Sequence, residues 1–296
     1  GGRWLDLNLG IEVDGERLDL LPILVNLIQN PEVDLSGPAL AQIKEDTRFI
    51  LRLDDGRYIF FPAARLKPIL STLVELYDPM ARLRGDGRMR LSQLQATELA
   101  ELEQQAPELR WRGGEQARAW GRRLREFERI EPVAPPAELQ AELRPYQQEG
   151  LNWLQFLREF ELGGVLADDM GLGKTIQALA HLLLEKAAGR ADRPSLVVAP
   201  TSLMFNWKRE AERFAPSLRV VILQGPKRQQ HFDHLAEQDL VLTTYALLPR
   251  DLEVLTAQAW HLLILDEAQA IKNPRSKGAQ AARALVARHR LCLTGT

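Results

Sequence analysis

The chain has 296 residues, a formal net charge of −2 at pH 7, 45% hydrophobic residues and 26% charged residues. These values are typical of a folded globular protein and exclude a disordered chain, a collagen-like chain and a uniformly basic nucleic-acid-binding protein, although they do not exclude a local basic cleft. The length predicts two domains. The only cysteine, Cys292, excludes an internal disulfide and a multi-cysteine zinc site and fits a reducing cytoplasmic compartment. No apolar run of about 18 residues predicts a membrane span.

Short apolar segments in the first 130 residues are separated by three Asp-Gly dipeptides, at 14–15, 55–56 and 86–87. Around the second dipeptide, residues 48–53 and 57–61 alternate in polarity, which is the pattern of a β-hairpin. Each segment is followed by a leucine-rich stretch that predicts a helix, at 21–29, 64–76 and 91–105. We therefore expect a small α+β domain over residues 1–130. A degenerate hairpin–helix repeat is one interpretation, but the unequal spacing of the dipeptides favours chance.

An arginine-rich segment and a proline-rich segment mark the end of this domain. Seven arginines lie in a helical pattern between residues 110 and 129. They would either contact phosphate or form a solvated helix face, and the interleaved glutamates favour the solvated face. Residues 131–137 contain three prolines, which predicts an extended linker before a second domain over residues 138–296.

Short apolar runs alternate with helical segments throughout the second domain. The runs lie at 164–167, 195–199, 219–223, 240–243, 262–265 and 290–293. Continuous apolar runs of this length are typical of strands buried on both faces of a parallel sheet. Helical patterns between them, such as 175–188 and 203–214, favour right-handed crossover connections. We therefore expect an α/β fold with a doubly wound parallel sheet.

A glycine-containing loop with the sequence Asp-Asp-Met-Gly-Leu-Gly-Lys-Thr lies between an expected strand and an expected helix, which is the context of a phosphate-binding P-loop. Gly171 and Gly173 would let the backbone turn tightly and point its N–H groups at phosphate oxygens. Lys174 would reach the β- and γ-phosphates, and the hydroxyl of Thr175 would be a Mg²⁺ ligand. The generic pattern has a glycine where this chain has Asp168, so the pattern is only partly met.

An acidic pair follows the apolar run 262–265. Asp266 and Glu267 would lie at the carboxyl edge of the sheet, where open α/β sheets bind ligands. We expect Asp266 to hold Mg²⁺, mostly through water, and Glu267 to orient and deprotonate an attacking water. Gln269 would link the γ-phosphate to neighbouring segments. An acidic pair alone carries little information, but combined with the upstream P-loop it predicts an ATPase.

The P-loop and the acidic pair resemble those of the RecA-like ATPase cores of helicase superfamily II, and the surrounding residues resemble the Swi/Snf family of DNA-dependent ATPases. Six segments resemble that family's Q motif and motifs I, Ia, Ib, II and III, in this order: 143–154, 166–177, 197–207, 242–245, 265–273 and 293–296. The family also lacks the first glycine of the generic P-loop. The resemblance implies a RecA-like lobe with a doubly wound parallel sheet, preceded by the smaller α+β domain. Residues 1–130 are similar, less closely, to the helicase-associated region of bacterial members.

The resemblance also implies roles for individual residues, with ATP and Mg²⁺ as cofactors. Lys174, Asp266 and Glu267 would be catalytic, and Thr175 and Asp266 would hold the metal. The residues implied to bind the nucleotide are Arg144, Gln147, Asp169, Met170, Gly171, Leu172, Gly173, Lys174, Thr175 and Gln269. The residues implied to face nucleic acid are Pro200, Thr201, Ser202, Thr243, Thr244, Lys272 and Asn273, although capping of strand ends is an alternative role for the threonines. The residues implied to couple nucleotide state to DNA contacts are Thr294, Gly295 and Thr296.

The family implies an ATP-driven motor that moves along double-stranded DNA and remodels protein–DNA complexes. It would bind the phosphate backbone without sequence preference, with a DNA-bound protein such as a polymerase as a further partner. A cytoplasmic, nucleoid-associated location would follow, with no membrane partner. Because the chain stops at motif III, we expect a piece of a longer protein that lacks the second lobe and its arginine fingers and is weakly active or inactive alone.

Two alternative functions remain open at this point. One is a strand-separating DNA or RNA helicase, which the Swi/Snf-like wording of the motifs disfavours. The other is a nucleotide-binding interaction module without turnover. The presence of Lys174, Thr175, Asp266 and Glu267 argues against this second alternative.

Overall fold

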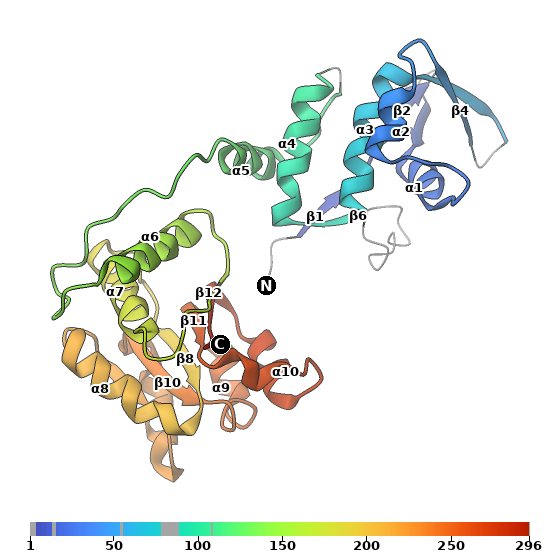
Figure 1. Cartoon of the computed structure of the whole chain (residues 1–296). Helices are drawn as coiled ribbons and strands as arrows, with labels where there is room; N and C mark the ends of the chain where they lie inside the picture. The colour runs from blue at the N-terminus through green and yellow to red at the C-terminus, as the bar shows by residue number, and fades with distance from the viewer. Residues whose placement is uncertain (1–3, 14–15, 54–55, 78–88, 108, 296) are drawn as a thin grey trace. The chain divides into compact units, whose positions relative to one another are not determined.

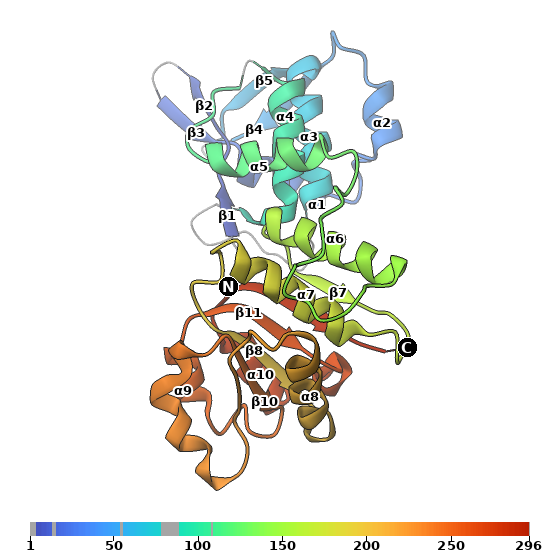
Figure 2. The same cartoon turned by 90° about the vertical axis from the view of Figure 1, so that its left-hand side faces the viewer.

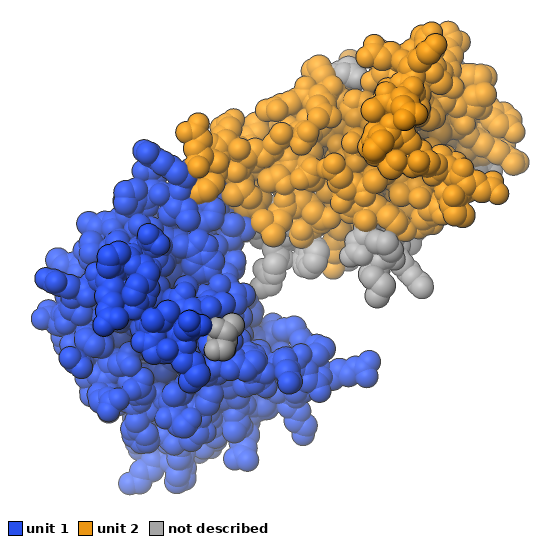
Figure 3. All heavy atoms as spheres, in the orientation of Figure 1, with its two compact units in different colours: residues 1, 129–296 blue, residues 2–128 orange. Residues whose placement is uncertain are grey.

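A computed structural model of the chain describes residues 4–13, 16–53, 56–77, 89–107 and 109–295. The chain divides into one compact unit of residues 2–128 and another that contains residues 129–296 (Figure 3). Each unit has a hydrophobic core of its own. No helix in the described part of the chain is long and apolar enough to cross a bilayer.

The first unit combines antiparallel strand pairs with helices around a leucine-rich core (Figure 1). The strand pairs are β1 (Trp4–Leu7) with β6 (Met89–Ser92), β2 (Gly10–Val13) with β3 (Glu16–Asp19), and β4 (Arg48–Arg52) with β5 (Tyr58–Pro62). The helices are α1 (Leu21–Gln29), α2 (Gly37–Gln42), α3 (Ala63–Leu76), α4 (Ala96–Gln105) and α5 (Glu115–Arg125), with a 3₁₀ turn η1 (Gln93–Gln95) before α4. The unit is therefore α+β, as expected.

The hairpin predicted around residues 55–56 is confirmed, because β4 and β5 form an antiparallel pair. The pairing runs from Arg52 opposite Tyr58 to Arg48 opposite Pro62. The dipeptides at 14–15 and 86–87 lie outside the described residues. The helix predicted over 91–105 is wrong in its first part. Residues 89–92 form β6 because this segment pairs with β1, which lies near the start of the chain. Met89 and Leu91 of β6 are buried.

The arginine-rich helix is shorter than predicted. Gly113 and Gly114 have φ angles of +76° and +71°, so α5 starts only after them. Arg118 is 7% exposed, and its Nε lies 2.9 Å from the Oε1 of Glu103 on α4. Arg122 also pairs with Glu103. Two of the arginines therefore stabilise the contact between α4 and α5 within this unit.

The second unit is built on a parallel sheet with the strand order β7-β12-β11-β8-β10-β9. Figure 2 labels β7, β11, β8 and β10 of this sheet. The strands are β7 (Gly164–Leu166), β8 (Ser195–Ala199), β9 (Val220–Ile222), β10 (Leu240–Thr244), β11 (Trp260–Leu265) and β12 (Ala287–Leu293). All residues of β8, β10 and β11 are buried, which explains why these strands are apolar on both faces. The predicted doubly wound parallel sheet is confirmed.

Helices cover both faces of this sheet (Figures 1 and 2). The helices are α6 (Pro145–Glu159), α7 (Lys174–Ala187), α8 (Met204–Phe214), α9 (Leu252–Ala257) and α10 (Lys277–Ala284), and the 3₁₀ segments are η2 (Thr201–Leu203), η3 (Pro226–Glu237) and η4 (Ala268–Ile271). Val197 of β8 packs in the core with α6, α7 and α8, whereas its neighbour Val198 packs in the core with α9 and α10. The alternation of side chains along each strand thus supplies both cores.

The central strands end together at one edge of the sheet. Leu265 of β11 pairs with Val198 on one side and with Cys292 on the other. At the neighbouring strand, Leu166 of β7 pairs with Leu293 of β12. The segments that follow β7, β8, β11 and β12 therefore start from the same edge, and they contain most of the predicted motifs.

Candidate functional site

The P-loop joins β7 to α7 and requires glycine at two positions. Gly171 and Gly173 have φ angles of +83° and +79°, a conformation that L side chains rarely adopt. A Cβ on Gly173 would also lie 2.5 Å from Nε2 of Gln147. Lys174 is the first residue of α7, so the loop places its backbone N–H groups and the lysine at a helix N-terminus.

Lys174 and Asp168 fix the conformation of this loop. The ammonium of Lys174 donates hydrogen bonds to the main-chain oxygens of Asp168 and Asp169, at 2.6 and 3.0 Å. The carboxylate of Asp168 accepts a 3.0 Å hydrogen bond from Nε2 of Gln177, which is fully buried in α7. The aspartate that replaces the usual first glycine therefore ties the start of the loop to the helix that follows.

The Q segment packs directly on the P-loop. Gln147 is 8% exposed; its Oε1 accepts a hydrogen bond from the backbone N–H of Arg144, and its Nε2 donates one to the carbonyl of Leu172, both at 3.0 Å. The hydroxyl of Tyr146 donates to the same carbonyl at 3.1 Å. The structure thus brings together Arg144, Gln147 and the P-loop, with the amide of Gln147 bonded to the protein's own backbone.

Asp266 lies at the end of β11 and is 7% exposed. Its Oδ2 accepts a 2.7 Å hydrogen bond from Nε1 of Trp207, and its Oδ1 accepts a 3.0 Å bond from the backbone N–H of Glu267. Burial raises the pKa of Asp266 and outweighs these hydrogen bonds and the nearby Lys174 ammonium, which favour the ionised form. The hydroxyl of Tyr245 donates to the main-chain oxygen of Asp266 at 2.8 Å.

A chain of hydrogen bonds connects the acidic pair to the end of β12. Glu267 has a φ of +50°, which turns the backbone sharply out of the strand. Its carboxylate accepts a hydrogen bond from Gln269, and Oε1 of Gln269 accepts one from the hydroxyl of Thr294 at 2.8 Å. A Cβ on Gly295 would lie 2.7 Å from Cγ of Met170, so this segment also contacts the P-loop. Thr296 lies outside the described residues.

The residues at this edge fit a Mg²⁺–nucleotide. The P-loop would supply N–H groups and an ammonium for phosphates, and Thr175 and Asp266 would supply oxygen ligands of the kind that Mg²⁺ prefers. Each carboxylate oxygen of Asp266 accepts one protein hydrogen bond and keeps a free lone pair. In the described part of the chain no group of three or more His, Cys, Asp or Glu residues is arranged to hold a metal ion.

The residues expected to face nucleic acid fall into two groups. Exposed positions at the sheet edge are occupied by Thr201, Ser202, Lys272 and Asn273, and Pro200 is half-buried beside them. Thr243 and Thr244 of β10 are instead 0% and 3% exposed. Their hydroxyls are enclosed because β10 is buried on both faces, which argues against direct phosphate contacts by these two side chains.

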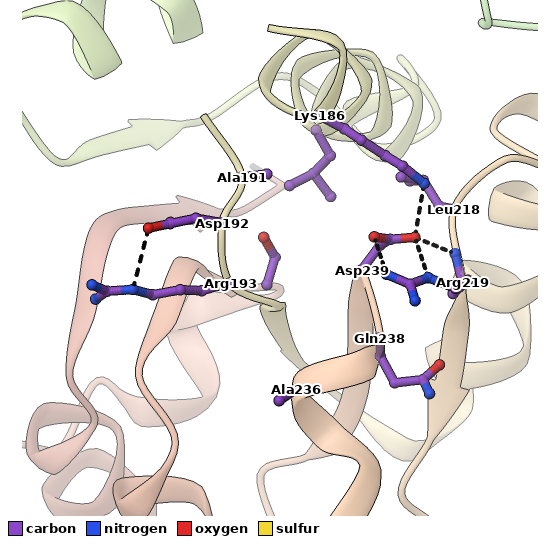
Figure 4. Close-up of a pocket in the computed structure, with 11 residues that line it drawn as sticks. Lys186, Ala191, Asp192, Arg193, Leu218, Arg219, Ala236, Gln238 and Asp239 are labelled. Carbon is purple, nitrogen blue, oxygen red and sulfur yellow. Dashed lines mark hydrogen bonds and ion pairs between the residues drawn. The ribbon is translucent and has the colours of Figure 1, made fainter. Parts of the chain in front are cut away.

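A pocket of about 100 Å³ lies in the second unit (Figure 4). None of the residues that line it belongs to the P-loop. It borders Ser195 and Asp239, at the amino ends of β8 and β10. The carboxylate of Asp239 is held between Lys186 at 2.9 Å and Arg219 at 3.1 Å. Burial favours a raised pKa for Asp239, but the hydrogen bonds from Arg219 and Lys186 outweigh it and lower the pKa. The charges of this pocket are paired with one another.

A buried polar cluster also lies at the amino edge of the sheet. Glu185 of α7 is fully buried, and its Oε2 lies 3.3 Å from Nε2 of His261 on β11. Burial lowers the pKa of His181 and of His289 to about 4. Both imidazoles are therefore neutral at pH 7. The charged or titratable groups that surround these two imidazoles are Glu185, His261, Arg158 and Arg288.

Trp207 and Tyr245 both contact Asp266, and the sequence alone predicts no individual role for either residue. One signal was present for Trp207. A tryptophan on the apolar face of a helix carries one N–H group, and that group needs a partner when the ring is buried. The identity of the partner depends on tertiary contacts between α8 and β11, which a single sequence does not reveal.

Comparisons with known proteins identify relatives that match more than half of this chain. Over 184 residues the chain is 45% identical to YwqA of Bacillus subtilis, a candidate ATP-dependent helicase/translocase, and the match covers 61% of this chain and 20% of that protein. Over 181 residues it is 38% identical to the TATA-binding protein-associated factor MOT1 of Saccharomyces cerevisiae, covering 57% of this chain and 10% of that protein. The chain thus spans only a small part of either relative.

A solved structure and a family model agree with these relatives. The SWI2/SNF2 ATPase core of Sulfolobus solfataricus in complex with dsDNA is 40% identical, with a TM-score of 0.53, and the match covers 56% of this chain and 34% of that chain. Residues 146–296 match the family model described as the SNF2-related domain. That match covers half of the chain and includes the P-loop, Asp266 and Glu267. The chain therefore belongs to the SNF2-related family, and its second unit is the first RecA-like lobe of the ATPase core.

Proposed function

We propose that this chain is the first ATPase lobe of an ATP-driven motor that moves along double-stranded DNA and remodels protein–DNA complexes. The observation that carries the proposal is the convergence of the P-loop, the Asp266–Glu267 pair and the exposed residues Thr201 and Ser202 on one edge of the sheet. Nucleotide chemistry and nucleic-acid contact would then share the same strand ends. The Sulfolobus relative, an ATPase core solved in complex with dsDNA, supports the choice of duplex DNA.

In this proposal each residue of the nucleotide site has a distinct task. The P-loop amides and Lys174 bind the β- and γ-phosphates, and Gln147 with Arg144 recognises the adenine. Thr175 and Asp266 hold Mg²⁺, which when bound would neutralise charge on the phosphates. Glu267 orients the attacking water and accepts its proton.

The hydrogen bonds from Glu267 through Gln269 to Thr294 would report the state of the γ-phosphate to the rest of the motor. The segments after β8 and β11 would bind DNA phosphates, so affinity would be independent of sequence and would fall steeply with salt. Because the chain spans 34% of the Sulfolobus core, we propose that full turnover needs the rest of the protein, including an arginine finger. We further propose a nucleoid-associated location and a DNA-bound protein as the target, in keeping with the name of MOT1.

The test is the steady-state ATPase rate of the complete protein, measured without nucleic acid and with duplex DNA, single-stranded DNA or RNA. Duplex DNA should raise the rate. Lys174→Ala should weaken ATP binding, whereas Glu267→Gln should leave binding intact and lower kcat by at least about 100-fold. Stimulation by RNA but not by duplex DNA would point instead to an RNA helicase. Failure of both variants to change the rate would contradict an ATPase role for this site.

A further inference from the structure

Trp207 and Asp266 form a direct contact between two elements of the second unit. Trp207 lies on α8 and is 1% exposed, and Asp266 follows β11 and is 7% exposed. The indole N–H donates to the carboxylate Oδ2 at 2.7 Å, a short distance for a hydrogen bond to a carboxylate. Because both groups are buried, little solvent competes for this bond, and it restricts the rotation of the carboxylate.

A second aromatic residue fixes the backbone of the same aspartate. The hydroxyl of Tyr245 donates to the main-chain oxygen of Asp266 at 2.8 Å. Side chain and main chain of Asp266 are therefore each held by one aromatic donor.

Both donors come from segments that begin at the carboxyl edge of the sheet, where the nucleic-acid contacts are proposed. Trp207 lies within the first turns of α8, which directly follows the exposed residues Thr201 and Ser202. Tyr245 is the first residue after β10. The contacts thus connect the segments after β8 and β10 to the carboxylate at the end of β11.

Trp260 shows what a buried indole does when it has only a packing role. Trp260 is fully buried at the start of β11, and its Nε1 donates to the main-chain oxygen of Leu255 at 2.8 Å. The indole N–H of Trp207 also needs a hydrogen-bond acceptor, and it donates to the carboxylate of Asp266 at the opposite end of the same strand. The two tryptophans are therefore a matched pair in burial and in hydrogen bonding.

We propose that Trp207 is a positioning residue, which orients the Asp266 carboxylate for Mg²⁺, and that Tyr245 holds the backbone beneath it. This inference rests on the proposed role of Asp266 as a magnesium ligand. Residues that orient a metal ligand typically change metal affinity by about 10- to 100-fold when they are replaced. Such a link would let DNA contacts after β8 and β10 alter the geometry of the nucleotide site.

The experiment compares Trp207→Phe with Trp260→Phe in the full chain. Binding of a fluorescent ATP analogue is measured in EDTA and then over a series of Mg²⁺ concentrations, and urea unfolding of each variant reports its stability. Both variants should bind the analogue in EDTA like the wild type. Trp207→Phe should raise the Mg²⁺ concentration for half-maximal tightening by about 10-fold or more, whereas Trp260→Phe should not.

Two further variants test the inference even if Trp207→Phe lowers the stability of the fold. Tyr245→Phe deletes one hydroxyl and should shift the Mg²⁺ dependence in the same direction, by a smaller factor. In an Asp266→Asn background, Trp207→Phe should add no further shift, because its effect passes through the carboxylate. If the Mg²⁺ concentration for half-maximal tightening is the same in Trp207→Phe, Tyr245→Phe and Trp260→Phe, the inference is overturned and the proposed function stands. A wild-type chain that binds no ATP analogue would overturn both.

Discussion

Thr294 donates a 2.8 Å hydrogen bond to Gln269, which joins the end of β12 to the turn that follows β11. Gln269 in turn donates to the carboxylate of Glu267. The backbone N–H of Thr294 donates to the carbonyl of Leu166 at the end of β7. Thr294 therefore contacts both the element that carries the proposed general base and the strand that leads into the P-loop.

Replacing Thr294 with valine should break this connection while keeping the shape of the side chain. We expect kcat of the complete protein with duplex DNA to fall about 3- to 10-fold with little change in the KM for ATP, since a neutral hydrogen bond contributes about 1 kcal/mol. Steady-state ATPase kinetics check this. Thr256→Val is the control, because Thr256 bonds to the carbonyl of Leu252 within α9. A larger loss in the control would refute the special role of Thr294.

Gly173→Ala should disable the P-loop by two effects. The φ of +79° strains an alanine, and the added Cβ would approach Nε2 of Gln147 to 2.5 Å. We expect ATP affinity to fall at least 10-fold and the free energy of unfolding to drop by about 1–3 kcal/mol. Gly189→Ala is the control, with a φ of +66° but no atom within 4 Å of the new Cβ. If both variants bind ATP equally well, the steric argument is wrong.

Lys272 should contact a DNA phosphate, because it is exposed at the site edge after η4. Lys272→Ala should weaken duplex binding to a similar extent on every sequence and reduce the slope of log affinity against log salt by about one. Fluorescence anisotropy over a salt series measures both quantities. Lys208→Ala, which removes an exposed lysine paired with Glu212 on α8, is the comparison. Identical slopes in wild type and Lys272→Ala would rule out a phosphate contact.

Acidification should destabilise the second unit through His181 and His289. Their pKa values are about 4 in the folded chain, against 6.5 for an ordinary histidine, so the unfolded chain takes up protons first as the pH falls below 6.5. Their contribution to stability is complete above pH 6.5 and is lost towards pH 4. We expect a loss of about 3–4 kcal/mol between pH 7 and pH 5 in urea unfolding.

The double variant His181→Gln, His289→Gln should show a flatter dependence on pH over this interval. His234→Gln should not, because His234 is exposed and its hydrogen bond to Glu237 raises rather than lowers its pKa. Between pH 7 and pH 5 the lowered pKa of Glu185 adds little, since its effect appears only as the pH falls below the ordinary range of a carboxyl group. A wild-type slope no steeper than that of the double variant would contradict this prediction.

The parts of the structure that depend on local sequence were predictable. Strand β8 spans Ser195–Ala199 as expected, because a continuous apolar run is bounded by Pro194 and Pro200. The P-loop was predictable because its glycines and Lys174 lie within a few residues of each other in the sequence. The position of Asp266 followed from the apolar strand before it.

The parts that depend on distant contacts were not predictable. Strand β6 exists because it pairs with β1, which is more than 80 residues earlier in the sequence, whereas the local leucine spacing indicates a helix. Thr243 and Thr244 appeared suitable for phosphate contacts, but β10 is enclosed on both faces and leaves them buried. The bond from Trp207 to Asp266 joins residues far apart in the chain, and no pattern in a single sequence specifies it.

Displacement of the third strand from a DNA triplex tests the central claim most directly, because a motor that moves along the duplex removes the third strand without separating the other two. We predict that the complete protein releases the third strand when ATP and Mg²⁺ are present, and that Glu267→Gln binds the same DNA but releases none. ATP-dependent separation of the duplex strands with no movement along intact duplex, or release by Glu267→Gln at the wild-type rate, would contradict the account.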